Sequence, residues 1–186
     1  MTAIRIGVIS PIDLAFPTVG AAFAELWPEA EPINLLDDSL YADFINDDMT
    51  IPDPMPAEAY DRVAALLRYS RDCGADGVIF CGSVFGLLVE AGREGIDVPV
   101  LTSYEGMIAA AFANGPRLGM LSTTQPTIDC LSADVARDAA AHGLEYTVTS
   151  KVADGAFQTL LDGDRDGHDD IVVAAAETIN DCDSLL

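Results

Sequence analysis

Short apolar runs alternate with segments of helical periodicity along the whole chain, and this alternation constrains the fold more than any other feature. The runs Ala3 to Ser10, Ile33 to Leu36 and Gly77 to Cys81 are typical of buried strands. The same rhythm returns in a second round that opens with Val98 to Leu101. Strands that alternate with helices predict parallel sheets covered by helices on both faces. We therefore expect an α/β protein.

The two rounds predict two flavodoxin-like halves, each a doubly wound parallel sheet, at residues 1–95 and 96–186. Residues 37–56 and 161–170 are rich in polar residues and turn formers, which predicts loops. The residues from Asp183 onward look like the start of a further strand, and we expect this end to return toward the N-terminal half. Helices are expected at about 18–27, 57–73, 83–90, 104–113, 126–142, 153–161 and 169–180, and further strands at 117–121 and 145–149.

The charge of the chain excludes one class of partner. Its formal net charge is -22, with 31 Asp and Glu against nine Lys and Arg, so it repels phosphate backbones and we expect no nucleic-acid partner. Adaptation to high salt would produce the same composition. No apolar run approaches the ~20 residues that span a bilayer, and the N-terminus lacks the layout of a signal peptide. We expect a cytoplasmic protein without a membrane partner.

Metal and nucleotide motifs are absent from the sequence. The four cysteines form no C-x-x-C pair, and with only two histidines no zinc spacing appears. Neither G-x-G-x-x-G nor G-x-x-x-x-G-K occurs, and G-x-S-x-G is missing too. A metal-binding acidic loop at residues 162–170 stays open as an alternative, although the full EF-hand spacing is not there. We therefore expect no cofactor and no metal.

Ligands of parallel α/β folds lie beyond the carboxyl ends of strands, which directs attention to Ser10-Pro11 and to the corner Cys81-Gly82-Ser83. Free backbone N–H groups of Ser83 and Val84 would suit a carboxylate or an enolate oxygen. Cys81, at the start of a helix, would have a lowered pKa and could act as a base. The alternative is that Cys81 is a core thiol that ends a buried strand.

A second candidate cradle is the turn Leu121 to Thr127, where Thr123 and Thr124 follow a strand and precede a helix. A plain helix N-cap would explain these hydroxyls equally well. His168 lies in the acidic stretch ahead of the last expected helix, and it is a candidate ligand contact or a solvated surface histidine.

Several segments together resemble one known family. They are FAELWPEAEPINLLDDSL from Phe23, GADGVIFCGSVFG, the VPVL strand with Glu105 and Met107 after it, LSTTQPT, and GDRDGHDD. In this order they resemble an uncharacterised branch of the Asp/Glu/hydantoin racemase superfamily, over essentially the whole chain. The resemblance implies two flavodoxin-like halves with the active site between them. It also implies proton abstraction next to a carboxylate by paired cysteines, without cofactor, in a possible homodimer.

The chain departs from the branch pattern at both expected cysteines. Gly82 stands where the first cysteine is expected, one residue after Cys81, and Cys182 does not match the second. A glycine at the first position resembles arylmalonate decarboxylase, in which the small-residue turn serves as an oxyanion cradle.

These observations predict a cofactor-independent racemase or isomerase that acts at the carbon next to a small carboxylate. A decarboxylase of malonate-type acids and an inactive carboxylate-binding protein are the alternatives. Cys81 is the candidate base. The substrate would contact Ser10, Pro11, Gly82, Ser83, Val84, Thr123, Thr124 and His168.

Overall fold

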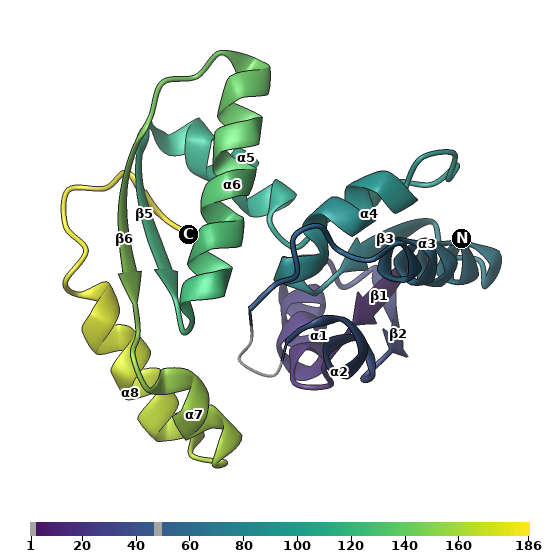
Figure 1. The fold of residues 1–186 in the computed structure, drawn as a ribbon, viewed down its shortest axis with the longest axis horizontal. Helices are drawn as coiled ribbons and strands as arrows, with labels where there is room; N and C mark the ends of the chain where they lie inside the picture. The colour runs from purple at the N-terminus through teal and green to yellow at the C-terminus, as the bar shows by residue number, and fades with distance from the viewer. Residues whose placement is uncertain (1–2, 47–49) are drawn as a thin grey trace. The chain divides into compact units, whose positions relative to one another are not determined.

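The structure, a computed structural model, describes residues 3–46 and 50–186, and the chain divides into two compact units. Unit 1 comprises residues 1–103 and unit 2 comprises residues 104–186. Each unit is built on its own parallel sheet (Figure 1). The expected fold class, α/β with two halves that each contain a parallel sheet, is confirmed.

Sheet A of unit 1 has four strands in the order β2-β1-β3-β4, all parallel. The strands are β1 (Ile4–Ser10), β2 (Ala30–Leu36), β3 (Gly77–Phe80) and β4 (Val100–Leu101). The helices are α1 (Ala15–Leu26), α2 (Leu40–Phe44), α3 (Ala57–Asp72), the 3-10 turn η1 (Ser83–Phe85) and α4 (Gly86–Gly92).

The apolar pattern of the sequence accounts for the core of unit 1. β1 is central in the sheet and its last five residues are buried, as a continuous apolar run requires. Helix α3 buries Ala59, Val63 and Leu67, which are spaced four residues apart and therefore lie on one stripe. These residues pack with Phe80 and Phe85, both fully buried, in one apolar cluster.

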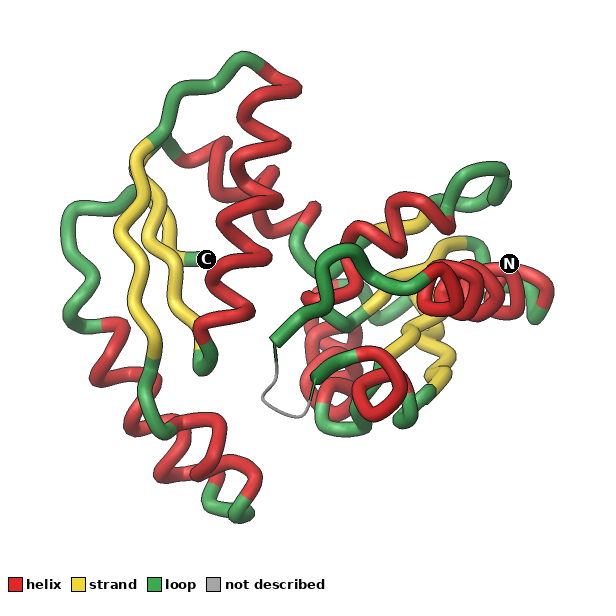
Figure 2. Tube along the Cα trace, viewed as in Figure 1, coloured by secondary structure: helices red, strands yellow, loops and turns green. Residues whose placement is uncertain are grey.

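Sheet B of unit 2 has three parallel strands in the order β6-β5-β7. They are β5 (Arg117–Ser122), β6 (Thr147–Val152) and β7 (Ser184–Leu185). Helices α5 (Glu105–Asn114), α6 (Gln125–His142), α7 (Ala156–Leu161) and α8 (Arg165–Ala176) surround them. In Figure 2, α6 (red) lies alongside β5 and β6 (yellow), and its residues Ile128, Leu131 and Val135 are buried against this sheet's core.

Two features of the chain's organisation differ from the expectation. The strand expected to open the second round forms as β4 and pairs with β3 in sheet A, so unit 1 extends to Ser103 rather than to residue 95. The strand at the chain end, expected to return toward the N-terminal half, is β7 and pairs with β5 inside unit 2.

Both expected loops contain helix. Within residues 37–56, of which 47–49 lie outside the described residues, α2 forms at Leu40–Phe44. The acidic stretch 161–170 is not a continuous loop, because α8 begins at Arg165. The Asp164 side chain accepts a hydrogen bond from the Gly167 N–H at 2.9 Å, which caps the helix and explains why so polar a segment becomes helical.

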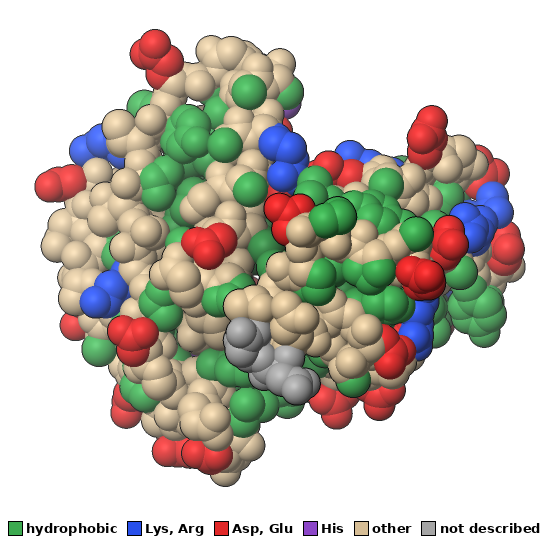
Figure 3. Space-filling view, viewed as in Figure 1, with side chains coloured by type: hydrophobic (Ala, Val, Ile, Leu, Met, Phe, Trp, Pro, Cys, Tyr) green, Lys and Arg blue, Asp and Glu red, His purple; other side chains and the backbone are tan. Residues whose placement is uncertain are grey.

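The acidic side chains do not gather into one patch on the face drawn in Figure 3, where red side chains are scattered among the others. Across the described residues, no helix has both the length and the apolar character that a membrane span requires.

Candidate functional site

The carboxyl ends of β1, β2 and β3 are tied together by backbone hydrogen bonds. The Asp37 N–H donates to the Ser10 carbonyl at 3.0 Å, and the Cys81 N–H donates to the Ile9 carbonyl at 2.7 Å. The Ser10 side chain is fully buried. Its hydroxyl donates to the Ile12 carbonyl at 2.7 Å, lies 3.4 Å from the Cys81 carbonyl and accepts from the Ile12 N–H at 3.3 Å. The Ser10 hydroxyl therefore holds the turn after β1 and the turn after β3, and its hydrogen bonds are all to backbone groups.

Close packing in the corner after β3 explains why residue 82 is a glycine. A Cβ built at this position would lie 2.8 Å from Phe80 Cε1, 3.0 Å from Pro11 Cγ and 3.1 Å from Phe85 Cδ2. Phe80 and Phe85 are fully buried and Pro11 is buried, so none of them moves aside easily. A cysteine at position 82, as the branch pattern expects, would overpack this corner.

The same corner leaves backbone donors free. Gly82 accepts a hydrogen bond from the Phe85 N–H at 3.0 Å through its carbonyl. In the part of the chain that the structure describes, the N–H groups of Gly82, Ser83 and Val84 have no acceptor. Ser83 and Val84 are half-buried. Three consecutive unpaired amides at the carboxyl end of a parallel strand are suited to oxygen atoms that carry negative charge.

The thiol of Cys81 has the opposite pKa shift to the expected one. Burial raises the pKa of Cys81, because the thiolate loses hydration in this half-buried position. The expectation of a lowered pKa relied on a helix beginning at this corner. The element there is a 3-10 turn of three residues, whose dipole is small. Cys81 therefore stays protonated to a higher pH than an exposed cysteine would.

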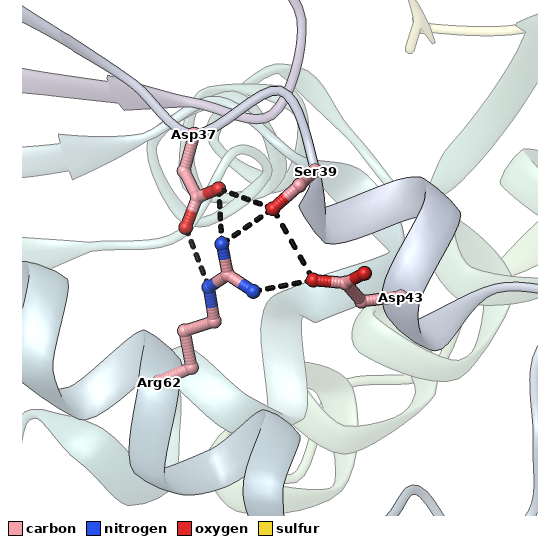
Figure 4. Close-up of polar contacts among 4 residues, drawn as sticks. All are labelled: Asp37, Ser39, Asp43 and Arg62. Carbon is pink, nitrogen blue, oxygen red and sulfur yellow. Dashed lines mark hydrogen bonds and ion pairs between the residues drawn. The ribbon is translucent and has the colours of Figure 1, made fainter.

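A polar network missed by the sequence analysis lies at the end of β2 (Figure 4). The Arg62 guanidinium donates to both carboxylate oxygens of Asp37 at 2.7 Å, and also to Ser39 and Asp43. Asp37 is the buried member, with 12% of its side chain exposed. Arg62 lies on α3, and its three partners lie 19 to 25 positions earlier in the chain. No sequence pattern signals contact at such a separation.

In unit 2, the turn after β5 is organised by its own hydroxyls. The Thr124 N–H lies 3.4 Å from the Ser122 hydroxyl, and the Thr124 hydroxyl donates to that of Thr127 at 3.0 Å. Thr124 is the residue that precedes α6, and its side chain makes no capping bond to the helix backbone.

A hollow of about 440 Å³ opens beside this turn. Its polar lining comes from Ser122, Thr123 and His168, and its apolar lining from Leu121, Val172, Leu185 and Leu186. The structure thus brings together Thr123 and His168, which are 45 positions apart (168 less 123), while Thr124 is not part of the lining. His168 belongs to α8, and its Nδ1 lies 2.7 Å from a carboxylate oxygen of Asp169. Ser122 and Val172 were not among the expected site residues.

Neither remaining half-buried cysteine lies at this hollow. Cys130 is on α6, and burial together with Asp134 and Asp129 raises its pKa to about 11. Cys182 precedes β7 and therefore lies at the amino end of sheet B, whereas the hollow is at the carboxyl end of β5. Among the described residues, no group of three or more His, Cys, Asp or Glu is arranged to hold a metal ion, those of the acidic stretch included.

Solved structures of racemases and of a decarboxylase share this fold. Allantoin racemase from Klebsiella pneumoniae matches with a TM-score of 0.66 and 21% identity over 95% of this chain and 71% of that one. Aspartate racemase from Picrophilus torridus gives a TM-score of 0.66 at 9% identity, over 97% of this chain and 78% of that one. Unliganded arylmalonate decarboxylase matches with a TM-score of 0.58 and 21% identity, over 97% of this chain and 74% of that one.

No curated protein matches the chain at a significant level. The sequence profile of the family described as "Asp/Glu/Hydantoin racemase" matches residues 16–184. The chain therefore belongs to the Asp/Glu/hydantoin racemase family.

Proposed function

We propose that the chain is a cofactor-independent enzyme of the racemase or isomerase type that acts at the carbon next to a small carboxylate. Family membership supports the reaction class. The observation that carries the proposal is the row of unpaired N–H groups at Gly82, Ser83 and Val84, within a corner that packing keeps free of a side chain at position 82.

These amides match the charge that the reaction develops. Removal of a proton from the carbon next to a carboxylate places the electron pair on the carboxylate oxygens as an enediolate. Preorganised N–H donors stabilise such oxygens more in the transition state than in the ground state. In this proposal Ser10 and Pro11 do not contact substrate through hydrogen bonds. They hold the corner in place from the end of β1.

Cys81 is the proposed proton-transferring residue of unit 1. Because burial raises its pKa, the protonated thiol prevails at neutral pH and can deliver a proton to an enediolate carbon. Proton abstraction by the thiolate would become faster as the pH rises toward the pKa of the folded protein.

Decarboxylation of a malonate-type acid is the second candidate, and the packing at Gly82 favours it. Loss of CO2 breaks a carbon–carbon bond and leaves the electron pair on an enediolate, which then needs one proton. One acid is sufficient for this reaction, whereas racemisation by two thiols needs a cysteine where Gly82 has no room for one.

Unit 2 has a candidate hollow of its own, and Thr123 and His168 both line it. A hydroxyl and an imidazole suit the polar groups of an amino acid or a related acid, and the apolar lining suits a short side chain. In this scheme Thr124 positions the turn through Ser122 and Thr127.

The test is deuterium incorporation at the α-carbon of a panel of amino acids and substituted malonic acids, in D2O without added cofactor. Exchange without CO2 release identifies a racemase or isomerase, and CO2 release identifies a decarboxylase. If no acid reacts but one raises the melting temperature, the chain is a carboxylate-binding protein and the enzyme proposal is wrong.

Two variants assign the residues once an active acid is found. Cys81→Ala should lower the rate at least tenfold, because general acid–base groups contribute about 10²–10⁴-fold. Cys130→Ala, which removes a half-buried thiol on α6, is the matched control and should keep the rate. If the hollow of unit 2 binds the acid, Thr123→Val should raise the KM about three- to tenfold through one lost hydrogen bond. An unchanged rate in Cys81→Ala would remove this thiol from the mechanism.

A further inference from the structure

A second cavity lies within unit 1, and its lining shares no residue with the corner at Gly82. It has a volume of about 170 Å³ and is lined by Ile33, Asn34 and Leu35 of β2, by Tyr69 and Ser70 of α3, and by Arg5 near the start of β1. The corner at Gly82 follows the carboxyl end of sheet A, whereas Arg5 is the second residue of β1. The two places are therefore separate parts of the same unit.

Arg5 is the charged residue in the lining of this cavity. One nitrogen, Nη1, donates to the Cys73 carbonyl at the end of α3, at 2.9 Å. Arginine has five N–H donors, and no other side-chain bond of Arg5 is found among the described residues. Asp76 accepts a hydrogen bond from the Arg5 backbone N–H at 2.8 Å and therefore pairs with the main chain. Glu31 of β2 is the in-register neighbour of Arg5, but no ion pair joins it to the guanidinium among the described residues. The remaining donors of the guanidinium are free for an anion.

Ser70 supplies a second polar group. It is 7% exposed, and its hydroxyl makes no hydrogen bond within the described part of the chain. Its position depends on Gly7, since a Cβ at residue 7 would lie 1.9 Å from Ser70 Oγ. The Ser70 hydroxyl can therefore bond a ligand without breaking an existing protein contact.

We propose that this cavity binds a small monocarboxylate with a short apolar tail. The carboxylate would pair with the free donors of Arg5 and accept a hydrogen bond from Ser70. The tail would lie against Ile33 and Leu35. A planar guanidinium binds carboxylates in two-point fashion, and a partly enclosed cavity strengthens this pairing relative to water. The positive charge of Arg5 is important for attracting a carboxylate, because the chain as a whole carries a formal charge of -22 and repels anions.

The experiment is an NMR titration of the 15N-labelled full chain with sodium butyrate, with sodium chloride at the same sodium concentration as a reference. The amides of Gly7, Asn34 and Ser70 should shift along a saturating curve. Butyramide, which has the same shape without the charge, should shift them at least tenfold more weakly. Shifts at Gly82 to Val84 would report the other site, so the two are read separately.

Arg5→Met keeps the apolar stem and should weaken butyrate binding at least tenfold, as expected for a charge-assisted pair. The matched control is Arg68→Met, an exposed arginine of α3 outside the cavity, which changes the net charge equally. If Arg5→Met does not fold, Ser70→Ala should still weaken binding about threefold. The proposal is overturned if butyrate gives no saturable shift at these amides up to roughly 100 mM, or if butyramide binds as well.

Discussion

The ends of β3 in unit 1 and of β5 in unit 2 begin from similar sequence, a strand followed by small residues and a helix, but they present different chemistry. After β3, buried aromatic rings press on position 82, and the unpaired backbone amides of residues 82–84 are the main donors in the described part of the corner. After β5, the turn opens on a hollow, and side chains such as Thr123 and His168 line it. Packing around a turn therefore decides whether it presents main-chain or side-chain groups to a ligand.

The largest expected effect tests the closed packing of the first corner. Gly82→Cys should destabilise the protein by roughly 1–3 kcal/mol, because its Cβ would lie 2.8 Å from a buried ring. Urea unfolding measures this. Gly20→Cys is the control, since a Cβ there has nothing within 4 Å. If Gly82→Cys is as stable as Gly20→Cys, the corner has room for a thiol and the contrast with unit 2 disappears.

A second prediction concerns the ion pairs that lie at strand ends in the two units. Unit 1 carries its Arg62 cluster at the carboxyl end of β2, whereas the Arg117–Asp183 pair of unit 2 joins the amino ends of β5 and β7. Arg62→Met should destabilise the protein by about 1–2 kcal/mol, because the largely buried Asp37 carboxylate loses its cation and keeps only the Ser39 hydroxyl as a side-chain donor among the described residues.

Hydrogen exchange should show where this loss acts. The amides of residues 37–44 should exchange faster in Arg62→Met, whereas those after β5 should not change. Arg68→Met, on the same helix, is the control for removal of a positive charge. Equal exchange at residues 37–44 in both variants would mean that the cluster does not hold this segment.

The smallest expected effect is on alkaline stability. Burial raises the thiol pKa of Cys130 to about 11, so the folded state retains this proton to higher pH than the unfolded chain. The resulting stability is complete below the ordinary thiol pKa of about 8.5 and is lost as the pH rises through about 11.

Chemical unfolding at a series of pH values measures that slope. Cys130→Ala should lose less stability than the wild type as the pH rises, whatever its stability at neutral pH. Cys81→Ala in unit 1 should change the slope in the same direction, because burial raises that pKa too. Parallel curves for the wild type and both variants would contradict the pKa shifts.

The strands and most helices could be predicted from sequence because their signals are local. A continuous apolar run marks β1, and residues four apart mark the buried face of α3. The start of α8 could not be predicted in this way, because the segment is polar and the helix depends on one capping carboxylate, Asp164. The strand β4 formed as expected. Its pairing with β3 could not be predicted, because the residues of β4 do not specify which strand they pair with.

Local patterns were sufficient to predict the α/β class and the family, because periodicity and motif order are properties of neighbouring residues. Tertiary packing alone encloses Gly82 with aromatic rings, raises the pKa of the Cys81 thiol by burial and brings Thr123 and His168 to one hollow. Burial and long-range contact set these properties. They arise from residues distant in the chain, so no local pattern could specify them.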